Sequence, residues 1–361
     1  MIALRKNVQH LTKPILPVFT KNGTVGLELE RDALKLVQLK NNGNGIQLIA
    51  GGSDSLPPDI SPYTASWQHW AIEAISRITE DGKFKSRDVV AVIPTGNMFI
   101  EHIKTPRISD TTLKGKRNLS PNNDKLKQAV VSKIKHKLPF GAENAILRYI
   151  PTEDDSLLVM AADRSEIDKN LAIYENANLH IKAIATWPAA LANTYTAFFG
   201  RRQSDAQVVV LLLEIEQNWT KLVICRGRNL LFARLIPIGI TQLTDNSGHQ
   251  AGQEQDGDSD VGAESATAQS EENITRLVLE LNSCRRHFTS IHKRAHIERL
   301  IFLSGQVIDR SICQRIAKQL EIPAQVGDCL AAVEIQNPQQ VGIDRRGCQL
   351  NWATAFGLSL S

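Results

Sequence analysis

Hydrophobic and polar positions follow the same order in two separate parts of the chain. Residues 25–39 alternate as a strand, a hairpin turn and a second strand would, and residues 46–50 add a third strand. Residues 207–238 repeat this order with an apolar run, a hairpin and a third strand. Apolar residues at helical spacing follow each part. The pattern therefore predicts an α/β protein with two similar lobes.

Helices and further strands are predicted around these hairpins. Residues 63–78 place their apolar side chains on one helical face, and residues 126–138 form an amphipathic helix that ends before Pro139. Ser165 and Asp309 are expected to cap two further helices. The other predicted helices are 166–176, 188–198, 274–288 and 311–320, and the other strands 88–93, 98–104, 145–151, 157–162, 181–185 and 300–303.

An internal repeat connects the two hairpins. The pattern Glu-(Leu/Ile)-Glu, four residues, then Lys-Leu-Val runs from Glu28 to Val37 and again from Glu214 to Val223, 186 positions later (214 − 28). A repeat at this spacing indicates a duplicated β-hairpin domain.

Composition narrows the class of protein. The chain has 361 residues, of which 42% are hydrophobic, which is enough for two domains, and no run approaches the length of a membrane span. Residues 1–21 lack the apolar segment of a secretory signal. The five cysteines have no CxxC spacing, which favours buried thiols in a reduced compartment over a zinc site. A cytoplasmic protein is expected.

Charge is distributed unevenly. Eight acidic residues and no Lys or Arg lie between Thr244 and Asn273, so the net charge of +4 leaves +12 (4 + 8) on the remainder. This segment is expected to be a disordered loop, 244–273. The lysines of 125–137 are either a solvated helix face or a docking surface for anionic lipid or an acidic partner. Scarce aromatic residues argue against nucleic acid. The histidines at 136, 287, 292 and 296 lack ligand spacing and are expected at the surface.

Several short motifs lie in the order known from one protein family. The match covers roughly 25–243 and 274–360, and no single motif in it is highly specific. The quoted motifs are Val25-Gly26-Leu27-Glu28, Lys35-Leu36-Val37-Gln38-Leu39, Leu138-Pro139-Phe140, Val159-Met160-Ala161-Ala162, Trp187-Pro188-Ala189-Ala190-Leu191, Phe302-Leu303-Ser304-Gly305 and Ala355-Phe356-Gly357-Leu358.

These motifs resemble the actin-like superfamily and, within it, the PilM family of type IV pilus assembly proteins, which is related to the cytoplasmic domain of the secretion protein GspL. The resemblance implies an actin-like (ribonuclease H-like) duplicated two-lobe fold with an inserted subdomain in the first lobe. The expected divisions are an N-terminal tail at 1–24, a first lobe at 25–200 with its inserted subdomain at about 89–191, and a second lobe at 201–361.

The resemblance also implies a nucleotide site between two hairpins. The family's Asp, which orients the water molecules of the metal, becomes Glu28 and Glu214, and the Gly of each turn becomes Glu30 and Glu216. Gly is needed there because a side chain would block the approach of phosphate to the backbone. Gln306 replaces a further Gly. The positions of these altered loops are Glu28, Glu30, Lys35, Glu214, Glu216, Thr220 and Gly305.

We expect the cleft to be degenerate, without a bound cofactor. At ~4 Å and an effective dielectric constant of ~20, each carboxylate facing a phosphate costs about 4 kcal/mol. Lys35 or Lys221 could pair with the acids and stabilise the hairpin without a ligand. The alternative is that the acids point to solvent and that ATP with Mg²⁺ still binds.

Three functions remain open. The first is a scaffold without catalytic residues, a pseudo-ATPase that binds the N-terminal cytoplasmic segment of a PilN-like inner-membrane protein and other components of a pilus or secretion platform. It would be peripheral on the inner membrane through its partners. By resemblance, the segment would enter between the 25–39 hairpin sheet and the inserted subdomain. The second is a protein whose lobes close on ATP, and the third is a sugar- or acetate-kinase-like enzyme, for which no general base is identifiable.

Overall fold

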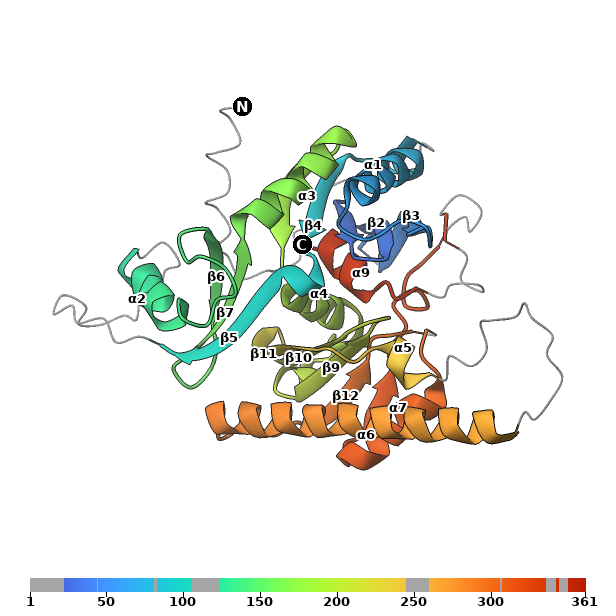
Figure 1. Ribbon diagram of the computed structural model, residues 1–361. Helices are drawn as coiled ribbons and strands as arrows, with labels where there is room; N and C mark the ends of the chain where they lie inside the picture. The colour runs from blue at the N-terminus through green and yellow to red at the C-terminus, as the bar shows by residue number, and fades with distance from the viewer. Residues whose placement is uncertain are drawn as a thin grey trace. The chain divides into compact units, whose positions relative to one another are not determined.

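The computed structural model describes residues 23–43, 45–80, 83–105, 124–244, 260–305, 307–335, 342–343 and 350–361 (Figure 1). Most of the predicted 1–24 tail lies outside these residues. The chain divides into two compact units, which are described separately below. Unit 1 comprises Met1–Ala197, Val333–Arg346 and Thr354–Ser361, and unit 2 comprises Phe198–Ala332 and Gly347–Ala353.

Unit 1 is built on a five-stranded mixed sheet in the order β3-β2-β1-β4-β8. The strands β1 (Val25–Leu29), β2 (Ala33–Asn41) and β3 (Ile46–Ser55) are antiparallel. The strands β4 (Asp88–Val92) and β8 (His180–Ala185) continue the sheet in parallel beside β1. Every residue of β1 is buried, which is expected of a central strand covered on both faces.

Two helices cover one face of this sheet. They are α1 (Ala65–Glu80) and α3 (Arg164–Asn176), and their apolar residues join Leu27 and Leu29 in one cluster. Trp67 and Trp70 are buried in this cluster, as the helical periodicity predicts. The N-cap of α3 is Asp163 rather than the predicted Ser165, whose backbone N–H donates to the Asp163 carboxylate at 2.8 Å.

A second, three-stranded antiparallel sheet interrupts unit 1 after β4. Its order is β5-β7-β6, with β5 (Met98–Lys104), β6 (Ala145–Pro151) and β7 (Ser156–Asp163). The helix α2 (Asp124–Ile134) covers one face through Leu126, Val130 and Ile134 (Figure 1). The predicted subdomain at 89–191 included β4 and β8, but both strands pair in the main sheet. A short 3-10 helix, η2 (Thr95–Asn97), leads into β5.

The end of the chain completes unit 1. The helices α4 (Trp187–Thr194) and α9 (Ala353–Ser359) meet where a Cβ on Gly357 would lie 1.8 Å from the carbonyl oxygen of Ala190. The Ser359 hydroxyl donates to the Thr24 carbonyl at 2.6 Å and accepts from the Leu39 N–H at 2.9 Å. The sequence placed all of 201–361 in the second lobe, whereas residues 354–361 belong to unit 1.

Unit 2 repeats the sheet of unit 1 strand for strand, in the order β11-β10-β9-β12-β13. The antiparallel strands are β9 (Val209–Ile215), β10 (Thr220–Arg226) and β11 (Asn229–Ile236), and the parallel ones are β12 (Arg299–Phe302) and β13 (Ala324–Val326). The helices are α5 (Ile240–Leu243), α6 (Asp260–Ile291) and α7 (Arg310–Leu320), with a short 3-10 helix η4 (Gln203–Ala206). A π-helix, η3 (Tyr195–Phe199), links the two units along the chain. The predicted duplication is present in the fold.

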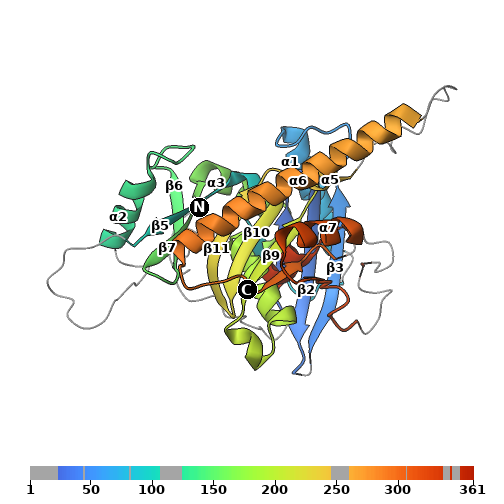
Figure 2. The same ribbon diagram turned by 90° about the horizontal axis from the view of Figure 1, so that it is seen from below.

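The long helix α6 packs with α7 along the β9–β11 sheet (Figure 2). Its buried residues include Ile274, Leu281 and Phe288. The sequence predicted a disordered loop over 244–273. Residues 245–259 lie outside the described part of the chain, but 260–273 is helical, so this part of the prediction is wrong. Ala, Glu and Gln dominate 263–272 and extend a helix readily once its packed part has formed.

Two predictions about reactive side chains had different outcomes. His292 was expected at the surface but is fully buried, with its ring 5.1 Å from that of Phe288. The cysteines at 225, 284, 313 and 329 are buried and free, as predicted, while Cys348 lies outside the described residues. Burial raises the pKa of the Cys225 thiol to about 12 and that of Cys284 to about 11.

Candidate functional site

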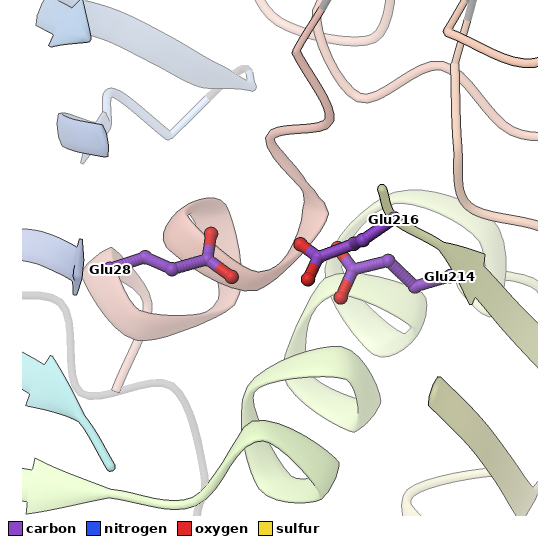
Figure 3. Close-up of side chains that lie close together, drawn as sticks. All are labelled: Glu28, Glu214 and Glu216. Atoms are coloured by element: carbon purple, nitrogen blue, oxygen red, sulfur yellow. The ribbon is translucent and has the colours of Figure 1, made fainter. Parts of the chain in front are cut away.

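The first hairpin holds a buried ion pair across its two strands. Glu28 of β1 lies opposite Lys35 of β2 in the antiparallel register, and the Lys35 Nζ is 2.8 Å from the Glu28 Oε2. Figure 3 labels Glu28, which extends from β1. Both side chains are almost completely buried, at 0% and 5% exposure for Glu28 and Lys35. The pairing that the sequence suggested for Lys35 is present.

The turn of this hairpin carries the second acid, Glu30. The Glu30 N–H donates to the Ala33 carbonyl at 2.9 Å and closes the turn. The Glu30 carboxylate accepts the Thr95 N–H at 3.1 and 3.2 Å and the Thr95 hydroxyl at 2.5 Å. Hydrogen bonds to a charged group contribute about 1.5–3 kcal/mol each. The Glu30 carboxylate thus accepts hydrogen bonds from both donors of Thr95, the first residue of η2.

Other groups surround the same turn. The Trp67 Nε1 donates to the Arg31 carbonyl at 3.0 Å, and the Leu56 N–H donates to the Asp32 carbonyl at 2.8 Å. Burial, together with the negative charge of Glu30, raises the pKa of the half-exposed Tyr63 to about 12. The backbone carbonyls of Arg31 and Asp32 therefore already accept hydrogen bonds from the protein.

The second hairpin repeats the ion pair and adds to it. Glu214 of β9 lies opposite Lys221 of β10, and the Lys221 Nζ is 3.1 Å from the Glu214 Oε2 and 3.1 Å from the Glu216 Oε2. Figure 3 shows the carboxylates of Glu214 and Glu216 next to each other. The Lys221 and Glu214 side chains are fully buried and that of Glu216 is 13% exposed. One ammonium therefore serves two carboxylates.

The two hairpins agree in detail. The Glu216 N–H donates to the Trp219 carbonyl at 2.8 Å, as the Glu30 N–H does to Ala33. The positions of the acids, the lysine and the turn acceptor are each displaced by 186 residues (216 − 30, 221 − 35 and 219 − 33). The repeat in the sequence therefore encodes a repeated cross-strand ion pair.

Backbone groups fill the space around the second turn. A Cβ on Gly239 would lie 2.4 Å from the carbonyl oxygens of Glu216 and Gln217, so glycine is required for this close approach. The Ile240 N–H donates to the Glu216 carbonyl at 2.8 Å. Gly239 was not among the residues predicted from the sequence, although a glycine directly before a short helix was a usable signal.

Two residues predicted for the nucleotide loops have structural contacts. The Thr220 hydroxyl donates to the Ile238 carbonyl at 2.7 Å, which connects β10 to the segment directly after β11. Gly305 follows β12 with a positive φ of 57°, and the preceding Ser304 hydroxyl accepts the Ile215 N–H at 3.0 Å. Gln306 lies outside the described residues.

A metal ion does not fit the acids of either hairpin as they stand. Mg²⁺ prefers carboxylate oxygens, which Glu214 and Glu216 offer. The Lys221 ammonium is 3.1 Å from both carboxylates, however, and its positive charge would oppose a second cation there. Lys35 has the same effect beside Glu28. Each hairpin therefore contains its own counter-ion.

Comparison with known proteins identifies the family. The family model described as type IV pilus assembly protein PilM matches residues 26–361. The chain belongs to the PilM family. This confirms the family that the motifs suggested. A comparison with curated proteins finds no match.

Solved structures similar to this chain include three with TM-scores between 0.44 and 0.71. A structure titled "PilM-PilN type IV pilus biogenesis complex" has a TM-score of 0.71 at 19% identity, over 94% of this chain and 98% of that chain. The ethanolamine utilization protein EutJ of Carboxydothermus hydrogenoformans has a TM-score of 0.48 at 10% identity, over 98% and 93%. The cytoplasmic domain of EpsL from Vibrio cholerae has a TM-score of 0.44 at 9% identity, over 93% and 94%.

The duplicated sheets and the first of these matches confirm the predicted actin-like fold. Within the described part of the chain, no helix is both long enough and apolar enough to cross a bilayer.

Proposed function

We propose that this protein is a non-catalytic scaffold of a type IV pilus or type II secretion-like assembly platform. It binds the N-terminal cytoplasmic segment of a PilN-like inner-membrane protein, and through that partner it lies at the cytoplasmic side of the inner membrane. Its nucleotide site is degenerate, so neither the fold nor the binding of the partner depends on ATP.

The repeated ion pair is the observation that carries this proposal. At the positions where the superfamily brings backbone to phosphate, Glu30 and Glu216 add side chains and negative charge. Glu30 already fills the hydrogen-bond donors of Thr95, and Lys35 and Lys221 already neutralise the acids of the strands. A triphosphate would have to displace these contacts and would face carboxylates at a cost of about 4 kcal/mol per close pair.

Isothermal titration with ATP and Mg²⁺ tests the degenerate site. We expect no heat of binding to the full chain, and no phosphate release over hours. A control titration without Mg²⁺ separates metal binding from nucleotide binding. Micromolar affinity or measurable turnover would instead support the alternative function, a protein whose lobes close on ATP.

The partner is proposed from family membership and from the printed title of the PilM-PilN complex, whose fold this chain shares. Within unit 1, the segment is expected to contact the region between the β1–β3 hairpin sheet and the three-stranded sheet, next to η2. This region contains Thr95, which joins the two sheets along the chain and is tied to the first hairpin through Glu30.

Capture with synthetic peptides tests the partner. The N-terminal cytoplasmic segment of a PilN-like protein is immobilised, and a scrambled peptide of equal charge is the control. We expect saturable binding to the native peptide alone, with and without ATP. Equal retention on both peptides would rule out this partner, and binding only with ATP would favour the alternative function.

A further inference from the structure

Five exposed lysines lie in the helix α2 and in the turn that follows it. Leu126, Val130 and Ile134 are buried against the three-stranded sheet. The lysines lie off this stripe and all are exposed. Lys125, Lys127 and Lys133 belong to α2, and Lys135 and Lys137 to the turn after it. We call these five residues together the α2 lysine face.

The sequence contains no acid within this face. Asp124 precedes the first lysine, Glu143 is the next acid along the chain, and residues 125–142 contain no Asp or Glu. From the adjacent strand β5, Glu101 pairs with Lys137 at 3.2 Å. The exposed Lys104 at the end of β5 adds a positive charge beside Lys133, which donates to the Lys104 carbonyl at 3.0 Å.

The residue types indicate what the face binds. All five basic residues are lysines, whereas arginine is the residue that recognises a single carboxylate or phosphate through two parallel hydrogen bonds. No aromatic residue stands among 124–138 to stack on bases, as single-stranded nucleic acids require. The lysines carry closely spaced positive charges on flexible side chains. Such charges favour binding to an extended anionic surface over binding to one defined ligand.

We propose that the α2 lysine face binds directly to the anionic phospholipid headgroups of a membrane. Each lysine near such a surface contributes about fivefold to the partition coefficient. This contact goes beyond the proposed scaffold function, because it would attach the protein to the bilayer without its partner. It depends on neither a nucleotide nor a PilN-like segment.

Vesicle sedimentation of the full chain tests this proposal. Vesicles of phosphatidylcholine containing phosphatidylglycerol are compared with vesicles of phosphatidylcholine alone. We expect binding to the anionic vesicles only, and its loss at about 1 M salt, where the screening length falls to about 3 Å. Equal binding to both vesicles, or none to either, would overturn the proposal.

Matched variants locate the contact. The triple substitution Lys127→Gln, Lys133→Gln and Lys135→Gln should lower the partition coefficient roughly a hundredfold. The same lysines changed to arginine should retain it. The control triple, Lys293→Gln, Arg294→Gln and Lys318→Gln, removes the same charge from exposed positions in unit 2 and should change it less than threefold.

Equal losses in the two glutamine triples would show a response to net charge alone and would overturn the assignment to α2. Binding of the wild-type chain to a single-stranded oligonucleotide or to an acidic peptide, but not to anionic vesicles, would also overturn it.

Discussion

The two hairpins share an ion pair but differ in the partner of their second acid. Glu28–Lys35 and Glu214–Lys221 occupy the same register position in the two sheets. Glu30 is bound by the N–H and the hydroxyl of Thr95, whereas Glu216 shares the ammonium of Lys221. The cross-strand pair thus depends on the hairpin alone. The second acid of the first hairpin depends on the segment after the neighbouring parallel strand, whereas that of the second hairpin is paired within its own hairpin.

That neighbouring strand differs between the units. In unit 1, β4 is followed by η2 and the three-stranded sheet, so that Thr95 brings two donors to Glu30. In unit 2, β12 is followed by Ser304, whose hydroxyl accepts from Ile215 in the sheet. A duplicated sequence motif therefore retains its local register, whereas its longer-range contacts depend on the insertion.

Removal of the lysines should have the largest effect. Loss of one partner of a buried ion pair costs about 3–5 kcal/mol. Lys221→Met removes an ammonium that two carboxylates share and should lie at or above the upper end of this range. Lys35→Met removes an ammonium that pairs with Glu28 and should lie at the lower end. Urea unfolding monitored by tryptophan fluorescence measures both, with exposed Lys293→Met as the neutral control.

A second substitution in each hairpin checks the cause. Glu214→Gln added to Lys221→Met, and Glu28→Gln added to Lys35→Met, should recover part of the lost stability, because each removes an uncompensated charge. A greater loss from Lys35→Met than from Lys221→Met would contradict the unequal sharing of the ammonium groups.

Removal of Glu30 and removal of Glu216 should lower the stability by different, and smaller, amounts. Glu30→Ala leaves the buried Thr95 N–H and hydroxyl without their acceptor and should cost about 1–3 kcal/mol. Glu216→Ala leaves the Lys221–Glu214 pair intact and should cost less. The same unfolding experiment measures both. Thr95→Val should reduce the further cost of Glu30→Ala, and additive losses would argue against the Glu30–Thr95 contact.

Cysteine reactivity should report on unit 2 alone, because all four described cysteines lie in it. Burial raises the pKa of Cys225 and Cys313 to about 12, so these thiols are neutral near pH 7 and react slowly with a disulfide reagent. Lys221→Met should accelerate their labelling, and Lys35→Met should not. Labelling is followed by mass spectrometry of peptides, and equal acceleration in both variants would show that the units unfold together.

The smallest effect is expected from two equivalent helix caps. Asp163 caps α3 and Asp309 caps α7, and in each case the N–H of the serine two positions later holds the pKa of the carboxyl below its usual range. Because the folded pKa is lowered, the stabilisation exists above the unfolded value of about 3.9 and is lost as the pH falls through the folded value. Asp163→Asn and Asp309→Asn should therefore each slightly reduce the loss of unfolding free energy between neutral and acidic pH, and by equal amounts. Unfolding midpoints measured at acidic and neutral pH test this, and an unchanged slope would argue against both caps.

Local patterns were sufficient to predict the hairpins and many of the surrounding elements. The repeat indicated the duplication, and a lysine near the acids of each hairpin suggested that Lys35 or Lys221 could pair with them. Asp309 was correctly predicted as a cap because Asp before an amphipathic run is a local signal. The inability of the site to bind nucleotide stays a prediction.

Long-range contacts were not predictable from these patterns. Glu30 and Thr95 are 65 positions apart, and no periodicity connects them. The burial of His292 depends on the packing of α6 against the sheet, and the helical start of α6 at Asp260 depends on the stability of its later turns. For the same reason the sequence placed residues 354–361 in the wrong lobe.

The return of the chain to its first unit affects the order of folding during synthesis. Thr24 and Leu39 obtain their hydrogen-bond partner from Ser359, and Gly26 packs against the backbone of Ala355. A nascent polypeptide emerging from the ribosome cannot satisfy these groups until residues 354–361 have left the exit tunnel. The unit encoded first is therefore completed last, after all of unit 2 has been translated.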